Sequence, residues 1–369
     1  MSLTGIADLP LHDGWVPRWL FSRMVKLARA LVSAVISEYG GEELVSRLAD
    51  PFWFQALGCV LGFDWHSSGL TTVVTAALRE AVSPTEHRVA VCGGKGKASL
   101  RAPSEIEEAC REMRVEHLTG ELTRASRLAA KVDNACVQDG YQLYHHAFVF
   151  TESGLWAVVQ QGMSPADRTA RRYHWLSAKV RSFTDEPHTA IVAERVRSRV
   201  LDMTAHESEG ARKASLDLVK EGPRRLARLI DEAAKGQKTL LRWIPAGSSE
   251  VSYLKMPWSI NWRALEEAYQ LQPSRYEELV EIRGVGPATV RGLALIAELI
   301  YGERASWRDP ARFSFAFGGK DGVPFPVDRK ALDEAIEFLT TALERADVRG
   351  REKLDALKRL RRLAATYTV

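Results

Sequence analysis

Residues 279–300 read LVEIRGVGPATVRGLALIAELI, and this stretch decides how the second half of the chain is interpreted. Apolar residues recur at helical spacing on both sides of a short turn, Arg283-Gly284-Val285-Gly286. Pro287 stands where a second helix would begin, a position that tolerates proline because its missing N–H is not needed there. The glycines allow a tight turn and the close approach of an anion. The pattern predicts two helices joined by a hairpin, with free N–H groups at the start of the second helix.

The same stretch resembles the helix-hairpin-helix motif of DNA repair proteins. That motif holds the sugar-phosphate backbone, so the resemblance implies DNA binding with little sequence preference and marked salt dependence. The alternative is a glycine-rich turn between packed helices without a ligand. The residues expected to contact DNA are Gly284, Val285, Gly286, Pro287, Ala288, Thr289 and Arg291.

Length and composition set the frame for the rest of the chain. With 369 residues it is long enough for two domains, and a net charge of +4 permits a polyanionic partner without requiring one. The four cysteines form no CxxC pair, which is typical of reduced thiols in the cytosol. No apolar run reaches the length of a membrane span, and residues 1–14 do not resemble a signal peptide. We therefore predict a cytoplasmic protein without a membrane partner.

The periodicity predicts an α+β protein, in which a mixed α/β domain with a β-hairpin precedes a mostly helical helix-hairpin-helix domain. The hairpin is predicted from residues 141–150 and 155–160, which flank a polar turn containing glycine. The predicted segments are the mixed α/β domain at 1–195, a charged helical connector and loop at 196–256, the helix-hairpin-helix domain at 257–345 and a basic amphipathic tail helix at 346–369.

Helical spacing marks the start of the first domain. It predicts helices at 17–39 and 42–48, followed by two apolar helices around a turn at 64–69. A buried strand is expected at 87–94, and Ser104 with Glu107 predicts a capping box for the next helix.

Polar residues interrupt the apolar text of this first domain, and they suggest a metal site. Near one end of a hairpin, carboxylates and histidines can hold a divalent cation that activates water against a phosphodiester. We predict Asp133, Asp139 and His145 as ligands of Mg²⁺ or Mn²⁺, with Asp64 and His66 as further ligands or bases. The alternative for each is a hydrogen-bonded core residue. His145 and His146 are adjacent, so on a strand they face opposite sides.

Basic residues in the first domain are candidates for phosphate contacts. The segment CGGKGKAS at 92–99 fails as a nucleotide-binding P-loop, because Gly96-Lys97 is followed by alanine and the first glycine of the motif is missing. A lysine-rich loop after a strand can still hold a nucleic-acid phosphate. The residues predicted for this role are Lys95, Lys97, Lys131, Arg171 and Arg172.

A second possible reaction comes from residues that follow the hairpin. VDRKALDEAI at 327–336 is similar to the segment of helix-hairpin-helix glycosylases that carries their catalytic aspartate, which would be Asp328. The lysine that forms a Schiff base in bifunctional members would fall at Ala288, so the resemblance implies a monofunctional enzyme. The alternative for Asp328 is a simple N-cap.

Long blocks of the sequence resemble one family. They include TGIADLPLH at 4–12, DPFWFQALGCVLGFDWHSSGLTT at 50–72, AKVDNACVQDGYQLYHHAF at 130–148 and FAFGGKDGVPFPVDR at 315–329. These are similar to the family called domain of unknown function 763, over roughly residues 3–340. The resemblance implies no activity and transfers no catalytic residue.

Together these observations predict a DNA-processing enzyme of DNA repair, namely a metal-dependent nuclease that hydrolyses phosphodiesters in duplex or branched DNA. The first alternative is the monofunctional glycosylase that uses Asp328. The second is a non-catalytic adaptor that binds DNA and recruits a helicase or nuclease.

Overall fold

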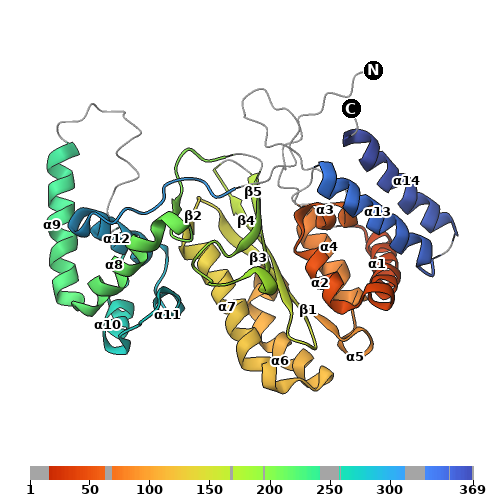
Figure 1. Ribbon diagram of the computed structural model, residues 1–369, viewed down its shortest axis with the longest axis horizontal. Coiled ribbons are helices and arrows are strands. Elements are labelled where there is room, and N and C mark those ends of the chain that lie inside the picture. The colour runs from red at the N-terminus through yellow and green to blue at the C-terminus, as the bar shows by residue number, and fades with distance from the viewer. Residues whose placement is uncertain are drawn as a thin grey trace.

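A five-stranded antiparallel sheet lies at the centre of the protein, between two groups of helices (Figure 1). The computed structural model describes residues 16–62, 69–166, 169–193, 196–241, 257, 259–311, 329–348 and 350–367. The strand order is β1-β3-β4-β5-β6. The bounds are β1 Val89–Lys95, β3 Gln142–Thr151, β4 Trp156–Ser164, β5 Thr169–Leu176 and β6 His188–Ala193, with β2 Val137–Gln138 and β7 Leu201–Asp202 in a separate ladder.

The hairpin predicted from the sequence is confirmed as β3 and β4, which pair His146 with Gln160. Successive side chains on a strand point to opposite faces, so each strand contributes to two cores. Phe148 and Trp175 belong to the core on one face, whereas Val149 belongs to the core on the other. The sheet is therefore buried on both sides and positions polar side chains toward either helical layer.

The first helical layer combines the two ends of the chain (Figure 1). Its helices are α1 Arg18–Tyr39, α2 Gly41–Leu48, α3 Pro51–Val60, α4 Gly69–Ala81, α5 Pro84–His87, α13 Arg329–Arg345 and α14 Gly350–Tyr367. Leu339 of α13 and Leu360 of α14 lie in one core with Trp53 of α3. The sequence predicts that α13 belongs to the helix-hairpin-helix domain at 257–345. In the structure, the apolar face of α13 packs instead on the N-terminal helices.

The second helical layer lies on the opposite side of the sheet, where its first two helices cover the sheet face and the other five pack beyond them. Its helices are α6 Ala102–Met113, α7 Thr119–Ala135, α8 Glu209–Lys220, α9 Pro223–Leu241, α10 Trp262–Leu271, α11 Tyr276–Glu281 and α12 Pro287–Ile296. Short helical turns are η1 Gly96–Arg101, η2 Glu116–Leu118, η3 Ser177–Lys179, η4 His206–Ser208 and the π-helical η6 Ala297–Tyr301. Leu128, Leu218, Leu279 and Leu293 share one core, which joins α7, α8, α11 and α12 to the sheet.

Two local expectations differ from the structure. The segment 196–256 was expected to be a connector, yet α8 within it contributes Leu218 to the core that also contains α11 and α12. The capping box is wrong: α6 begins at Ala102, and the Ser104 hydroxyl donates to the carbonyl of Arg101 at 2.9 Å. Pro103 is the second residue of α6. Proline is tolerated in the first turn of a helix because its missing N–H is not needed there, so the helix begins before Ser104.

All four cysteines are buried and none forms a disulfide. Among the helices of the described ranges, none combines the length and the apolar character needed to cross a membrane.

Candidate functional site

A cavity of about 910 Å³ opens between η1, α7, the start of β3 and the turn that follows α11. We call it the basic cavity. Its lining residues are Ser99, Leu100, Pro103, Gly120, Thr123, Arg124, Ser126, Arg127, Leu128, Ala130, Lys131, Asn134, Leu143, Tyr144, His145, His146, Gln160, Glu281 and Arg283. Segments separated by up to 184 positions in the chain therefore line one space.

Cationic side chains surround the basic cavity. Arg127 and Arg283 are exposed, and neither forms an ion pair with an acidic residue in the part of the chain that the structure describes. The Lys95 ammonium lies 6.0 Å from the centre of the Tyr144 ring, which lines the cavity. Lys97 is exposed on η1, the turn that supplies two other lining residues. The structure thus brings the predicted phosphate contacts Lys95 and Lys97 to the same side as the turn after α11.

Lys131, a third predicted phosphate contact, also lines the basic cavity but has a structural role. Its ammonium donates to the carbonyl of Val280 at 2.6 Å and to the carbonyl of Ile282. These are carbonyls at the end of α11, where a cation is favourable because the helix dipole is negative there. Burial lowers the pKa of the Lys131 ammonium. Lys131 therefore attaches the turn after α11 to the cavity wall on α7.

A short turn containing two glycines joins α11 to α12. Gly284 has φ +93°, a left-handed conformation that favours glycine. Val285 is 1% exposed and donates its N–H to the carbonyl of Ile282 at 3.2 Å, so its side chain fills the space between the helices. After Gly286, α12 begins with Pro287 and has no acidic residue in its first turn.

The three glutamates of α11 all have protein partners, and two of these partners are cations. Glu277 accepts a hydrogen bond from the N–H of Phe183 at 2.6 Å. Glu278 accepts one from the Arg275 side chain at 3.0 Å, and Glu281 pairs with the guanidinium of Arg124 at 2.9 Å. Glu278 and Glu281 are therefore paired with arginines other than Arg283.

A chain of buried polar side chains begins at the floor of the basic cavity. The Ser126 hydroxyl lies 2.8 Å from Nε2 of His146, and Nδ1 of His146 lies 2.9 Å from Oε1 of Gln160. Nε2 of Gln160 donates to Oδ2 of Asp133 at 2.5 Å. Ser126 is 2% exposed, His146 6% and Gln160 0%. All three nevertheless line the cavity.

Asp133 is the centre of this buried network. Its carboxylate also accepts hydrogen bonds from Nε1 of Trp175 at 3.0 Å and from Nε2 of His188 at 2.5 Å. His188 reaches a second, smaller pocket of about 190 Å³. The polar chain therefore runs through the protein from the basic cavity to this second pocket.

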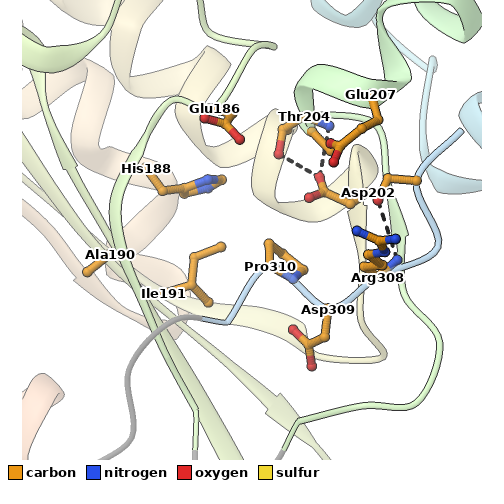
Figure 2. A pocket seen from close by; sticks show the side chains of 12 residues that line it. Glu186, His188, Ala190, Ile191, Asp202, Thr204, Glu207, Arg308, Asp309 and Pro310 are labelled. Carbon is orange, nitrogen blue, oxygen red and sulfur yellow. Dashed lines mark hydrogen bonds between the residues drawn. The ribbon is translucent and has the colours of Figure 1, made fainter. Parts of the chain in front are cut away.

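The second pocket is mainly acidic. Figure 2 shows Glu186 and His188 facing Asp202 and Glu207 across it, with Asp309 at another wall. Asp202 accepts hydrogen bonds from the backbone N–H and the hydroxyl of Thr204 at 2.8 and 2.6 Å, and burial raises its pKa. The sequence did not predict this pocket, because its members come from β6, β7 and the segment that follows η6.

Asp139 and Arg171 form a buried ion cluster instead of a metal and phosphate site. The Arg171 guanidinium pairs with Asp139 at 2.9 Å and with Asp309 at 2.7 Å, and all three side chains are 0% exposed. The hydroxyl of Tyr173 also donates to Asp139 at 2.6 Å. Burial raises the pKa of the Asp139 carboxyl, although Arg171 opposes this. Arg171 is therefore a buried core residue whose guanidinium is held by two carboxylates, and the prediction that it contacts a phosphate is wrong.

Arg172 points to the opposite face of the sheet. It donates to Nε2 of His174 at 2.8 Å and to the side-chain oxygen of Gln55 at 3.0 Å, and it lies over the ring of Phe54. Burial lowers its pKa to about 9. It is 6% exposed, so a phosphate on the surface cannot reach it in this conformation.

His145 also faces away from His146, as adjacent residues on a strand must. Its Nε2 lies 3.0 Å from the hydroxyl of Thr75 on α4, and burial lowers its pKa to about 3. Asp133, Asp139 and His145 thus have three separate sets of partners. Within the described ranges, no group of three or more His, Cys, Asp or Glu side chains is arranged to hold a metal ion. Asp64, His66 and Asp328 lie outside the described residues.

Sequence reasoning missed several residues of the basic cavity, above all Ser126, Arg127 and Gln160. One signal was present in α7, where Ser126, Ala130 and Asn134 recur every four residues and therefore share one helix face. Another was the polar Gln160 within an apolar strand, which needs a partner once it is buried. Neither signal shows that His146 would lie between them.

A family model described as "Protein of unknown function (DUF763)" matches residues 5–327 of the chain. No curated protein and no solved structure matches the chain.

Proposed function

Because the chain belongs to the DUF763 family, whose description assigns no activity, we propose a function from its own residues. The protein binds DNA, holding the sugar-phosphate backbone between the α11–α12 turn and the basic cavity. In this proposal α11, the turn and α12 form a helix-hairpin-helix element. The observation that carries the proposal is that Arg283 of this turn and Arg127 of α7 line the same cavity; both arginines are exposed and have no acidic partner among the described residues.

The start of α12 supplies the first set of contacts. The opening N–H groups of a helix have no partner within the helix, and the dipole is positive there, so both favour a phosphate oxygen. Gly286 has open space where a Cβ would stand, which lets the phosphate come close to the backbone. Arg291 lies one turn further along α12, with one guanidinium nitrogen 3.2 Å from the side-chain oxygen of Gln138.

The basic cavity supplies the second set of contacts. Arg127 and Arg283 line it directly, and Lys95 and Lys97 stand beside it. A cluster of cations next to a backbone-binding turn fits a polyanion that follows the surface from one to the other. Contacts of this type do not read base edges, so we propose little sequence preference.

The test is fluorescence anisotropy of labelled single-stranded, duplex and flapped oligonucleotides at increasing salt. We expect the double variant Arg127→Ala/Arg283→Ala to bind roughly a hundredfold or more weakly than the wild type, because charged hydrogen bonds to phosphate are each worth about 1.5–3 kcal/mol. The slope of log K against log salt should fall by about 0.7–0.9 for each cation removed.

Lys26→Ala is the control, since Lys26 is an exposed cation on α1 in the other helical layer. It should bind as the wild type does. Wild-type protein that fails to bind any of the three substrates at low salt would contradict the proposal, as would equal loss in the control and the double variant.

A further inference from the structure

Resting on the DNA-binding function just proposed, we propose that Ser126 and His146 form a nucleophile and general base that cleaves a phosphodiester of the bound DNA, with Gln160 as a positioning residue. The juxtaposition that supports it lies at the floor of the basic cavity: Ser126 Oγ, His146 Nε2 and Nδ1, and Gln160 Oε1 follow one another at 2.8 and 2.9 Å. A serine, a histidine and a third group that orients the histidine are the parts of a nucleophilic hydrolase site.

The direction of each hydrogen bond follows from Asp133. Its carboxylate receives the indole N–H of Trp175, a group that can only donate, and it also receives the amide of Gln160. Since the amide nitrogen of Gln160 must face this acceptor, its carbonyl oxygen faces Nδ1 of His146. Nδ1 then carries the proton and Nε2 carries the lone pair. Ser126 therefore donates its O–H to Nε2, the direction that a general base requires.

Other buried hydroxyl groups in the helices of this protein form hydrogen bonds with a purely structural role, and Ser126 differs from them. Buried hydroxyls within helices usually donate to the carbonyl four residues earlier. Thr123 does so to Thr119 at 2.7 Å, and Ser215 does so to Ala211 at 2.7 Å. Ser126 is instead directed to a histidine that is itself oriented, and it lines a cavity surrounded by cations.

The electrostatics of His146 fit the role of a base. Burial lowers its pKa, while the Gln160 hydrogen bond and the charge of Asp133 oppose this effect. The imidazole is therefore neutral near pH 7 and can accept a proton. When it does so, the carbonyl oxygen of Gln160 keeps hold of Nδ1–H, and the nearby Asp133 charge stabilises the imidazolium.

The reaction needs no co-reactant other than water. Ser126 transfers its hydroxyl proton to Nε2 of His146 while Oγ attacks the phosphorus. A P–Oγ bond forms, a P–O bond to one deoxyribose breaks, and the leaving oxygen takes the proton from His146. Water then attacks the phosphoserine diester, giving its proton to His146, and the Ser126 oxygen leaves and regains a proton. Arg127 and Arg283 line the same cavity and would stabilise the developing negative charge.

The position of Ser126 also defines the substrate. At 2% exposure it lies at the bottom of the cavity, below the rim formed by the arginines. A phosphodiester in a regular duplex cannot reach that depth, because the paired strand and the neighbouring stacked base pairs would have to enter the cavity with it. A nucleotide that has left the stack, or a single strand, can enter a cavity of about 910 Å³. The substrate is therefore unpaired DNA or an extruded nucleotide.

Two measurements on the full-length protein test the site. A fluorophosphonate probe, which phosphonylates activated serines independently of DNA, should modify Ser126 as read by peptide mass spectrometry. A labelled single-stranded or gapped oligonucleotide, incubated with chelator, should be cleaved and should give a protein-linked product on denaturing gels. Ser126→Ala should abolish modification and lower cleavage by at least about a thousandfold, as removal of a nucleophile does.

Controls separate chemistry from folding and from binding. Ser104→Ala removes an exposed serine on α6 that does not line the cavity and whose hydroxyl donates to the carbonyl of Arg101 at 2.9 Å, and it should retain full activity. His146→Gln should keep the affinity for DNA and lose cleavage. Asp133→Asn removes the negative charge that strengthens the hydrogen bond from the Gln160 amide and stabilises the imidazolium of His146, so cleavage should fall and its pH profile should shift.

The outcomes are distinguishable. If DNA binds but Ser126 is neither modified nor needed for cleavage, the nucleophile proposal is wrong and the DNA-binding proposal stands. If the probe modifies Ser126 but no oligonucleotide is bound, the proposed DNA function is wrong. Modification and binding without any cleavage would overturn the phosphodiester as substrate.

Discussion

The carboxylate of Asp133 accepts a hydrogen bond from the side-chain amide of Gln160 at 2.5 Å. This hydrogen bond determines which group donates and which accepts in each of the further hydrogen bonds that lead to Ser126. Asp133 therefore determines, through the orientation of the Gln160 amide, which nitrogen of His146 carries the proton. The two residues are on α7 and β4, so the hydrogen bond also joins the helix to the sheet below the basic cavity.

Replacing this anion gives the first prediction. The two carboxylate oxygens of Asp133 accept hydrogen bonds from Trp175, Gln160 and His188, and Asp133→Asn replaces one of these oxygens with an N–H donor. The asparagine side chain is uncharged and accepts hydrogen bonds on one side only, so the hydrogen bonds around it weaken and the unfolding free energy falls by about 1–3 kcal/mol. Urea unfolding followed by tryptophan fluorescence measures it. The exposed Asp217→Asn on α8 serves as control and should change stability little; equal stability of both variants would contradict the role of Asp133.

The two glycines of the α11–α12 turn should respond differently to alanine. At Gly284, φ is +93° and a Cβ would lie 2.4 Å from Nδ2 of Asn261, which caps α10. Gly284→Ala should therefore lower the unfolding free energy by about 1–2 kcal/mol or more. At Gly286 nothing lies within 4 Å of the added Cβ. Gly286→Ala should keep the melting temperature and weaken DNA binding, because the methyl group occupies the approach of the phosphate.

Thermal unfolding and anisotropy on the same preparations distinguish these effects. The proposed backbone contact would be contradicted if Gly286→Ala bound DNA as tightly as the wild type.

Arg171 should affect folding and leave the DNA-binding surface intact. Arg171→Met removes the cation between Asp139 and Asp309 and leaves two buried carboxylates close together. Breaking a buried ion cluster in this way costs about 3–5 kcal/mol. Calorimetry or urea unfolding should show this loss. A variant that folds with normal stability but loses DNA affinity would instead restore Arg171 as a phosphate contact.

The buried histidines predict how stability depends on pH. Burial lowers the pKa of His145 to about 3, whereas the imidazole in the unfolded chain titrates near its ordinary value. The unfolded state therefore binds a proton that the folded state does not as the pH falls from about 6.5 toward 3, and stability decreases. The contribution is fully present above about pH 6.5 and is lost at about 1.4 kcal/mol per pH unit below it.

His145→Gln isolates this effect. Glutamine does not titrate and can still meet the hydroxyl of Thr75, and its neighbours His146 and Lys95 are common to both proteins. Urea unfolding between about pH 6 and pH 4 should show a shallower loss of stability in the variant. Parallel curves would mean that His145 becomes protonated in the folded state.

The sequence predicted local elements well where a short-range signal defined them. The helices at 18–39 and 41–48 and the hairpin of β3 and β4 followed from periodicity and turn residues. Long-range packing was not predictable in the same way. The apolar stripe of α13 fits any complementary face, and only the folded chain shows that it meets α3.

The candidate site shows the same limit. Lys95, Lys97 and the glycine turn were recognised from local composition, and the structure brings them to one side of the protein. Asp133 and Asp139 were recognised as polar residues in apolar text, but their partners Gln160 and Arg171 lie on different strands. A buried carboxylate needs a partner for physical reasons, and sequence alone does not say whether that partner is a metal, an arginine or an amide.

The most direct measurement of the central claim is the location of bound DNA on the protein. A single-stranded oligonucleotide containing 5-bromodeoxyuridine is photo-crosslinked to the wild-type chain, and the modified peptides are identified by mass spectrometry. The account predicts crosslinks in 95–101, 123–134 and 282–291, the segments that form the basic cavity and the α11–α12 turn. Crosslinks confined to α1, α13 and α14 in the other helical layer would contradict it.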